Sequence, residues 1–147
     1  MATNTMSLGI FNDSIFTSSE LNRRSGYVLD QASEKPVTIT RNNDSFALVN
    51  RELMANMAMG IDQANKVIQL VNVVFRLTLG QKIESANEYK WLEEFDSEER
   101  VELVDELYEA LNQAQVTNDW EEVAAVIHEW RESAIAIASE ELDEAFA

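Results

Sequence analysis

Few residues of this chain have side chains that could perform acid–base or metal chemistry. The 147 residues include one histidine, His128, and no cysteine. Cysteine nucleophiles, thiolate metal sites and multi-histidine zinc sites therefore lack their ligands. A helical di-iron site places a glutamate three residues before a histidine, and that position is Ala125 here. We interpret His128 as a boundary residue near Glu132, and we predict a protein that is not an enzyme and holds no metal and no cofactor.

The many acidic side chains lie at spacings that do not favour catalysis. Several glutamates are adjacent in sequence, as in Glu98-Glu99 and Glu121-Glu122. Adjacent residues of a helix point about 100° apart, so such a pair cannot close on one proton or one ion. Glutamate is also seldom buried, and we interpret these pairs as solvated helix faces. The four glycines form no phosphate-binding loop.

The charge is strongly acidic and unevenly distributed along the chain. Eleven basic and 27 acidic groups give a formal net charge of −16. Residues 1–60 hold five of the basic and six of the acidic groups, whereas residues 61–147 hold six and 21. The first region is therefore nearly neutral, and almost all of the negative charge lies in the second. Such asymmetry is typical of a chain that meets two kinds of partner.

The first 60 residues predict a small unit of strands and helices. Residues 1–14 are polar and without period, which indicates a flexible arm. The elements expected after the arm are a strand over 15–17, a helix over 19–33, strands over 37–40 and 46–49, and a helix from Arg51 onward. Thr17 and Glu20 have the spacing of a helix capping box. Asn42-Asn43-Asp44 is typical of a turn between the two longer strands.

The long helix after Arg51 carries a heptad seam. Its apolar residues alternate at spacings of three and four: Met54, Met57, Ile61, Ala64, Ile68, Val71 and Phe75. Further apolar residues widen this seam, so we expect the helix to be buried on several sides. Gly80 is expected to end it. The stretch over 61–79 is too polar to span a membrane and the N-terminus does not resemble a signal peptide, so we expect a cytoplasmic protein without membrane contact.

Two acidic amphipathic helices are expected over 97–111 and 119–138. Asp96 or Ser97 caps the first, and Asn118 with Glu121 has the capping-box spacing for the second. The expected inner stripe of the first is Val101, Val104, Tyr108 and Leu111. The expected stripe of the second is Trp120, Val123, Ile127, Trp130, Ala134 and Ile137. The fold class is therefore α+β, with a small N-terminal unit over 15–59 and an acidic, all-helical region over 60–147.

Trp120, Ile127 and Trp130 have two interpretations. Tryptophan at core spacing usually belongs to the protein's own core, and we favour that for Trp130. Alternatively, the three residues form one side of a helix that docks onto a partner, which we favour for Trp120 at the first turn of the helix. The acidic groups on either side of the stripe would suit a basic partner surface.

The stretch over residues 15–57 resembles the prevent-host-death (Phd/YefM) antitoxin family. The matching segments are Ser-Glu-Leu-Asn-Arg at 19–23, Val-Leu-Asp-x-Ala at 28–32, Pro-Val-Thr-Ile-Thr-Arg at 36–41, an Asn-rich turn, and Phe-Ala-Leu-Val at 46–49. The resemblance covers about 43 of the 147 residues. No single segment is specific, but their order and spacing together are.

The resemblance implies a homodimeric antitoxin of a type II toxin–antitoxin pair. It implies a β-α-β-β(-α) unit that dimerises and binds operator DNA, so that the protein represses its own operon, and a C-terminal region that neutralises a cognate toxin. Family members contact DNA from the first helix and from the end of the second strand. The first-helix position falls on Asn22, beside Arg23 and Arg24, and the strand-end position falls on Arg41, next to Asn42.

Two other functions fit parts of the sequence. One is a helical protein-interaction module that keeps the N-terminal unit for dimerisation and does not bind DNA, which suits the mean charge. The other is an acidic mimic of DNA that inhibits a DNA-binding protein, which explains the charge but not the resemblance. The region after the sheet is about 90 residues long, and a typical family member is much shorter there.

Overall fold

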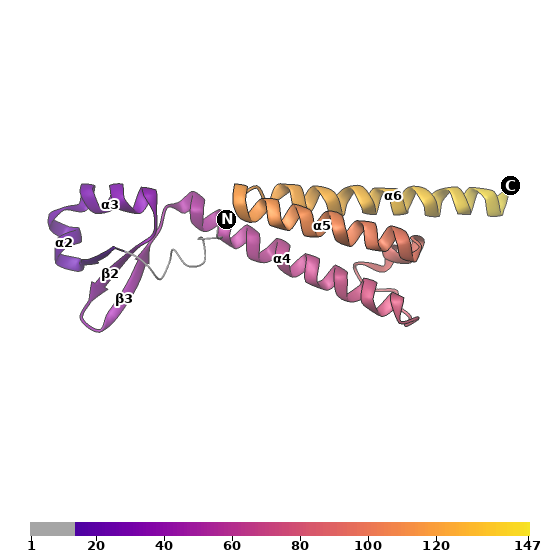
Figure 1. Cartoon of the computed structure of the whole chain (residues 1–147), viewed down its shortest axis with the longest axis horizontal. Coiled ribbons are helices and arrows are strands. Elements are labelled where there is room, and N and C mark those ends of the chain that lie inside the picture. The colour runs from indigo at the N-terminus through magenta and orange to yellow at the C-terminus, as the bar shows by residue number, and fades with distance from the viewer. Residues whose placement is uncertain (1–13) are drawn as a thin grey trace. The chain divides into compact units, whose positions relative to one another are not determined.

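The computed structural model of the chain describes residues 14–147 (Figure 1). They form two compact units, one ending at Ala58 and the other running from Met59 to Ala147. The sequence placed this division after residue 59. The fold is mixed, with a three-stranded sheet in a mostly helical chain, as the expected α+β class requires at the coarse level. Of the arm expected over residues 1–14, all but Ser14 lies outside the described residues.

The sheet of the first unit has the strand order β1-β2-β3. Strand β1 (Ile15–Thr17) pairs in parallel with β2 (Val37–Arg41), and β3 (Asp44–Leu48) pairs antiparallel to β2. Arg41 lies opposite Asp44, so Asn42 and Asn43 form a two-residue turn. Asn42 has a φ of 54°, in the left-handed region that Asn tolerates well. The expected turn is confirmed.

Two helices separate β1 from β2 where one was expected over 19–33. Helix α2 (Ser18–Arg23) and helix α3 (Ser25–Glu34) meet at Arg24, whose φ of −131° and ψ of 41° are not helical. Ser25 and Gly26 have weak helix propensity, which leaves little resistance to a break here. The capping box at the start of α2 is confirmed, because Glu20 N donates to Thr17 Oγ1 and Thr17 N donates to a Glu20 carboxylate oxygen.

The core of the first unit is small. Val28 and Ala32 of α3 pack with Val37 and Ile39 of β2 in one buried cluster, and Pro36 just before β2 is buried as well. Phe16, Leu21 and Leu48 pack against them while partly exposed. So small a core contributes little burial, which favours association of the unit with a second surface.

Helix α4 (Arg51–Thr78) ends as the sequence predicted. Gly80 has a φ of 73°, and the chain closes the helix with two backbone hydrogen bonds. Gln81 N donates to Arg76 O and Gly80 N donates to Leu77 O, both at 3.0 Å. This pattern is a Schellman motif, which needs a left-handed residue after the helix and therefore favours glycine.

The face of α4 that packs into the second unit is not the heptad seam. The buried residues of α4 are Gly60, Gln63, Val67, Leu70, Val73 and Val74. Ile61, Ile68 and Phe75 of the seam are 66%, 67% and 60% exposed. The expectation that this helix is buried on several sides is therefore wrong for the single chain, which buries one side of α4 and leaves the seam open.

The second unit is completed by a short 3-10 helix, η1 (Lys90–Glu94), and by helices α5 (Ser97–Thr117) and α6 (Glu121–Phe146). Helices α4, α5 and α6 lie alongside one another in Figure 1, and their buried side chains form one core. Asp96 caps α5 through a capping box with Glu99, as expected. The expected inner face of α6 is confirmed at Val123 and Ala134, which are 0% and 1% exposed.

The expected inner stripe of α5 is wrong at two of its four residues. Its buried residues are Leu103, Leu107, Ala110 and Ala114, whereas Val101 and Tyr108 are 57% and 67% exposed. Val104 and Leu111 are partly buried and lie at the border of the true stripe. Both stripes have helical spacing, so spacing alone does not decide which one is buried, and the buried stripe includes the small residues Ala110 and Ala114.

The capping box expected between Asn118 and Glu121 does not form. Asn118 instead ends α5 in the left-handed conformation, with a φ of 61°. Trp120 is the N-cap residue of α6 and supplies no capping side chain, while Glu121 N donates to Asp119 Oδ1 at 3.2 Å. Asn is favoured both in the left-handed position at the C-terminus of a helix and as an N-cap residue. Asn118 takes the first of these roles, at the end of α5.

Candidate nucleic-acid and partner interfaces

The polar residues expected to contact DNA from the first helix lie at the junction of α2 and α3. Asn22 and Arg23 end α2, Arg24 joins the two helices, and all three are exposed. The Arg24 guanidinium carbon lies 4.3 Å from the centre of the Tyr27 ring. This cation–π contact places the guanidinium group itself on the Tyr27 ring of α3, and both residues are exposed to solvent.

Arg41 and Asn42, the residues at the end of β2, lie at the same edge of the sheet as the start of α2, because the C-terminal ends of the parallel strands β1 and β2 meet there. The parallel register places Thr17 opposite Thr40, and α2 follows Thr17 directly. Arg41 is the next residue after Thr40, and Asn42 begins the turn; both are exposed. The topology therefore places Arg41 and the start of α2 side by side.

The electrostatics of this edge are only weakly positive. Asp44 faces Arg41 across the hairpin, and Glu20 lies in the first turn of α2. Glu20 is held by the capping box with Thr17. Among the described residues, neither Arg23, Arg24 nor Arg41 forms an ion pair. The arginines are therefore available for phosphate oxygens, which they bind in a charge-assisted geometry.

The structure packs the three residues expected to contact a partner against the protein's own core. Trp120 lies on Gly60 of α4, Ile127 packs on the core of the second unit, and all three are partly exposed. Trp130 Nε1 donates a 2.8 Å hydrogen bond to Glu106 Oε2 of α5. Its ring also meets Phe95 edge to face, with the ring centroids 5.1 Å apart. These contacts support the intramolecular alternative, and partner contact at these residues stays a prediction.

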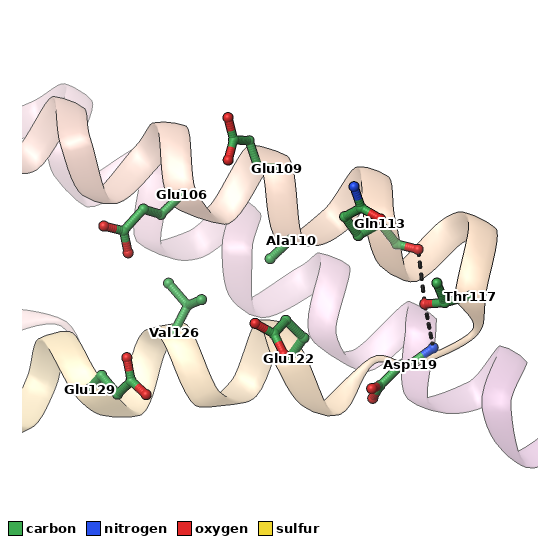
Figure 2. A pocket seen from close by; sticks show the side chains of 9 residues that line it. All are labelled: Glu106, Glu109, Ala110, Gln113, Thr117, Asp119, Glu122, Val126 and Glu129. Atoms are coloured by element: carbon green, nitrogen blue, oxygen red, sulfur yellow. Dashed lines mark hydrogen bonds between the residues drawn. The ribbon is translucent and has the colours of Figure 1, made fainter.

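Facing sides of α5 and α6 enclose an acidic groove of about 520 Å³. We call the acidic groove the hollow lined by Glu106, Glu109, Ala110, Gln113, Thr117, Asp119, Glu122, Val126 and Glu129. Figure 2 shows Ala110 and Val126 pointing toward one another across its floor. No basic residue lines it, so a positively charged guest would meet carboxylates on both helices.

The acidic groove was not predicted from the sequence, although a signal for it exists. Glu106, Glu109 and Gln113 follow one another at spacings of three and four on α5. Glu122, Val126 and Glu129 do the same on α6. Each set marks one polar side of one helix. The spacing within each helix does not reveal that these two sides face each other in the fold.

A smaller cavity of about 160 Å³ lies between α4, η1 and α6. Gln63, Tyr89 and His128 are among the residues that line it. Gln63 is 7% exposed, and its Oε1 has no hydrogen-bond partner within the described chain. Burial raises the pKa of the Tyr89 hydroxyl, and the nearby carboxylates of Glu88 and Asp62 raise it further.

Within residues 14–147, no group of three or more His, Asp or Glu side chains is arranged to hold a metal ion. None of the helices described combines the length and the apolar character needed to cross a bilayer.

Comparison of the chain with protein-family models, with curated proteins and with solved structures finds no match. The resemblance of residues 15–57 to the Phd/YefM antitoxins therefore rests on those residues alone.

Proposed function

We propose that the protein is an antitoxin-like, homodimeric DNA-binding protein that represses its own operon and neutralises a toxin through its C-terminal helices. The observation that carries the proposal is the placement of Arg41 on the sheet edge at which α2 starts. Arg23 and Arg24 lie at the end of that short helix and are exposed. A symmetric pair of such edges would present two basic clusters to a palindromic site.

The second unit supports a basic protein as the other partner. From residue 83 to the end, the chain holds 20 acidic and three basic groups. The acidic groove gathers five of these carboxylates around an apolar floor. A basic segment with one or two apolar side chains would fit such a groove, and the surrounding charge would accelerate its approach at low salt.

Fluorescence anisotropy against DNA from upstream of the protein's own reading frame tests the first half. Specific binding should be tighter to this DNA than to unrelated duplex of the same length, and it should weaken steeply with salt. Equal affinity for both duplexes, or no binding at low salt, would remove operator recognition.

Co-expression with the product of the neighbouring gene, followed by pull-down, tests the second half. The matched variants are Glu109→Gln with Glu122→Gln inside the acidic groove, and Glu140→Gln with Glu141→Gln outside it. Each double variant removes two negative charges, so a difference in binding between the two variants would report a contact inside the acidic groove. We expect the first pair to weaken capture and slow association, and the second pair to leave both nearly unchanged. An association rate that is insensitive to salt would contradict this mode of binding.

A second function is favoured by one specific observation. Asp44 lies directly opposite Arg41 in the hairpin, and the described first unit has as many acidic as basic groups. A helical interaction module that uses this unit only to dimerise would need no positive surface. Such a protein would bind the neighbouring gene product without binding DNA, so the two experiments above separate the two functions.

A further inference from the structure

We infer that two copies of the chain pair through the seam of α4, defined here as Ile61, Ala64, Ile68, Val71 and Phe75 together with Leu79, which directly follows the helix. This inference rests on the proposed function only in requiring a homodimer. It assigns the dimer contact to a part of α4 that lies beyond residues 15–57, the stretch that resembles the antitoxin family.

Helix α4 has two apolar sides, and the described part of the chain, residues 14–147, covers only one of them. At 100° per residue, the centre of the seam lies roughly 110° around the axis from the buried side formed by Gln63, Val67, Leu70 and Val74. Ile61, Ile68, Phe75 and Leu79 are each between 58% and 67% exposed, and Val71 is 36% exposed. A continuous apolar stripe of this kind marks an interaction site rather than ordinary surface.

The spacing of the seam favours a second helix of the same kind. Ile61, Ile68 and Phe75 recur every seven residues, and Ala64 and Val71 fill the alternate positions. This is the repeat by which helices pack side by side with knobs in holes. The small side chains at Ala64 and Val71 allow a close approach, and a two-fold axis lets the seam match itself.

The distribution of charge favours another copy of the chain as the partner. Between Leu53 and Leu79 the chain carries one acidic group, Asp62, and two basic groups, Lys66 and Arg76. Lys66 pairs with Asp62 at 3.0 Å, so this part of α4 is close to neutral. Residues 80–147 carry 20 acidic and four basic groups. The seam is therefore where two such acidic chains can meet with the least repulsion, and it offers no carboxylate to a basic partner and no cluster of lysines to an anionic lipid surface.

Sedimentation equilibrium on the full chain tests the pairing. The wild-type chain should be a dimer at micromolar concentration. Ile61→Glu with Ile68→Glu places charges in the seam and should weaken the dimer by roughly 100-fold or more, because each copy would bring two carboxylates into a desolvated contact. Val116→Glu with Ile135→Glu adds the same charges at positions that are 71% and 49% exposed on α5 and α6, and this control should stay dimeric.

A second pair of variants keeps the test decisive if the glutamates disturb folding. Ile61→Ser with Ile68→Ser removes the apolar contact without adding charge, and it should also weaken the dimer while far-UV circular dichroism stays helical. A monomeric wild-type chain, or seam variants that remain dimers, would overturn the inference. Loss of DNA binding by a chain that still dimerises would instead count against the proposed function, so the two failures can be told apart.

Discussion

The indole of Trp120 lies directly on the backbone of Gly60. A Cβ atom added to Gly60 would lie 2.8 Å from Cε2 and from Cζ2 of that ring. Both residues belong to the second unit, with Gly60 in α4 and Trp120 at the start of α6. Glycine inside a helix usually costs stability, so its presence at this point of α4 is explained by the room that the ring needs.

Gly60→Ala should therefore destabilise the protein, against the ordinary preference of helices for alanine. We expect a loss of about 1–3 kcal/mol, because the ring must move from a packed position. The matched control is Gly26→Ala in α3, where an added Cβ meets nothing within 4 Å. That change should gain up to about 1 kcal/mol. Thermal melting of both variants checks the pair, and a stabilising Gly60→Ala would show that the ring does not occupy this place.

Trp130→Ala should lower the melting temperature strongly. Its ring packs against Phe95 and its Nε1 donates to Glu106, so we expect a loss of about 3 kcal/mol. Trp130→Phe keeps an aromatic ring against Phe95 and removes only the hydrogen bond, which should cost about 1 kcal/mol. If Trp130→Ala melts like the wild-type chain but fails to capture the partner, Trp130 belongs to the partner surface after all.

Stability should fall as the pH rises above about 10, the usual pKa of tyrosine. The pKa of Tyr89 is raised in the folded state, so the unfolded chain loses its proton first. Alkaline pH then favours the unfolded chain. The loss of stability starts as the pH rises above the unfolded pKa and continues until the pH passes the raised pKa of folded Tyr89.

Tyr89→Phe should flatten this alkaline loss relative to the wild-type chain. Tyr108→Phe is the matched control, because Tyr108 is 67% exposed. Denaturant unfolding between pH 8 and pH 11 measures both. Equal alkaline slopes for Tyr89→Phe and the wild-type chain would contradict the assignment of the effect to Tyr89, since lysines also lose protons in this range.

Arg41→Ala should weaken operator binding and lower the slope of log K against log salt by roughly one unit for each phosphate contact that is lost. Arg23→Ala with Arg24→Ala should do at least as much if the end of α2 faces the DNA. Lys35→Ala is the control. Lys35 lies just before the first residue of β2, whereas Arg41 is the last residue of that strand, so the two side chains lie at opposite ends of β2. Intact promoter binding in all three arginine replacements would show that this surface is misassigned.

The features predicted correctly from the sequence are those decided by a few neighbouring residues. The capping box of Thr17 and Glu20, the left-handed Asn42 and the helix stop at Gly80 each depend on backbone chemistry within one turn. The break at Arg24 was missed because an apolar stripe runs past it from Leu21 to Val28. Such a stripe reports which side is buried and says nothing about continuity of the backbone.

The other errors concern which side of a helix is buried, because this depends on how neighbouring helices pack against it. Helix α5 has two apolar stripes, and only the approach of its neighbours selects Leu103 and Leu107 over Val101 and Tyr108. The acidic groove exists only because Glu109 and Glu122 lie on facing sides of different helices. The heptad seam of α4 was recognised, but its spacing does not reveal that the single chain leaves Ile68 uncovered.

The positions of the three tryptophans give the protein a built-in optical reporter for one of its parts. Trp91, Trp120 and Trp130 all belong to the second unit and pack against its core, and the first unit contains none. Tryptophan emission during denaturation therefore follows the helical unit alone, whereas far-UV circular dichroism follows both. Transitions that differ between the two signals would show that the two units unfold separately, and no label or truncation is needed to see it.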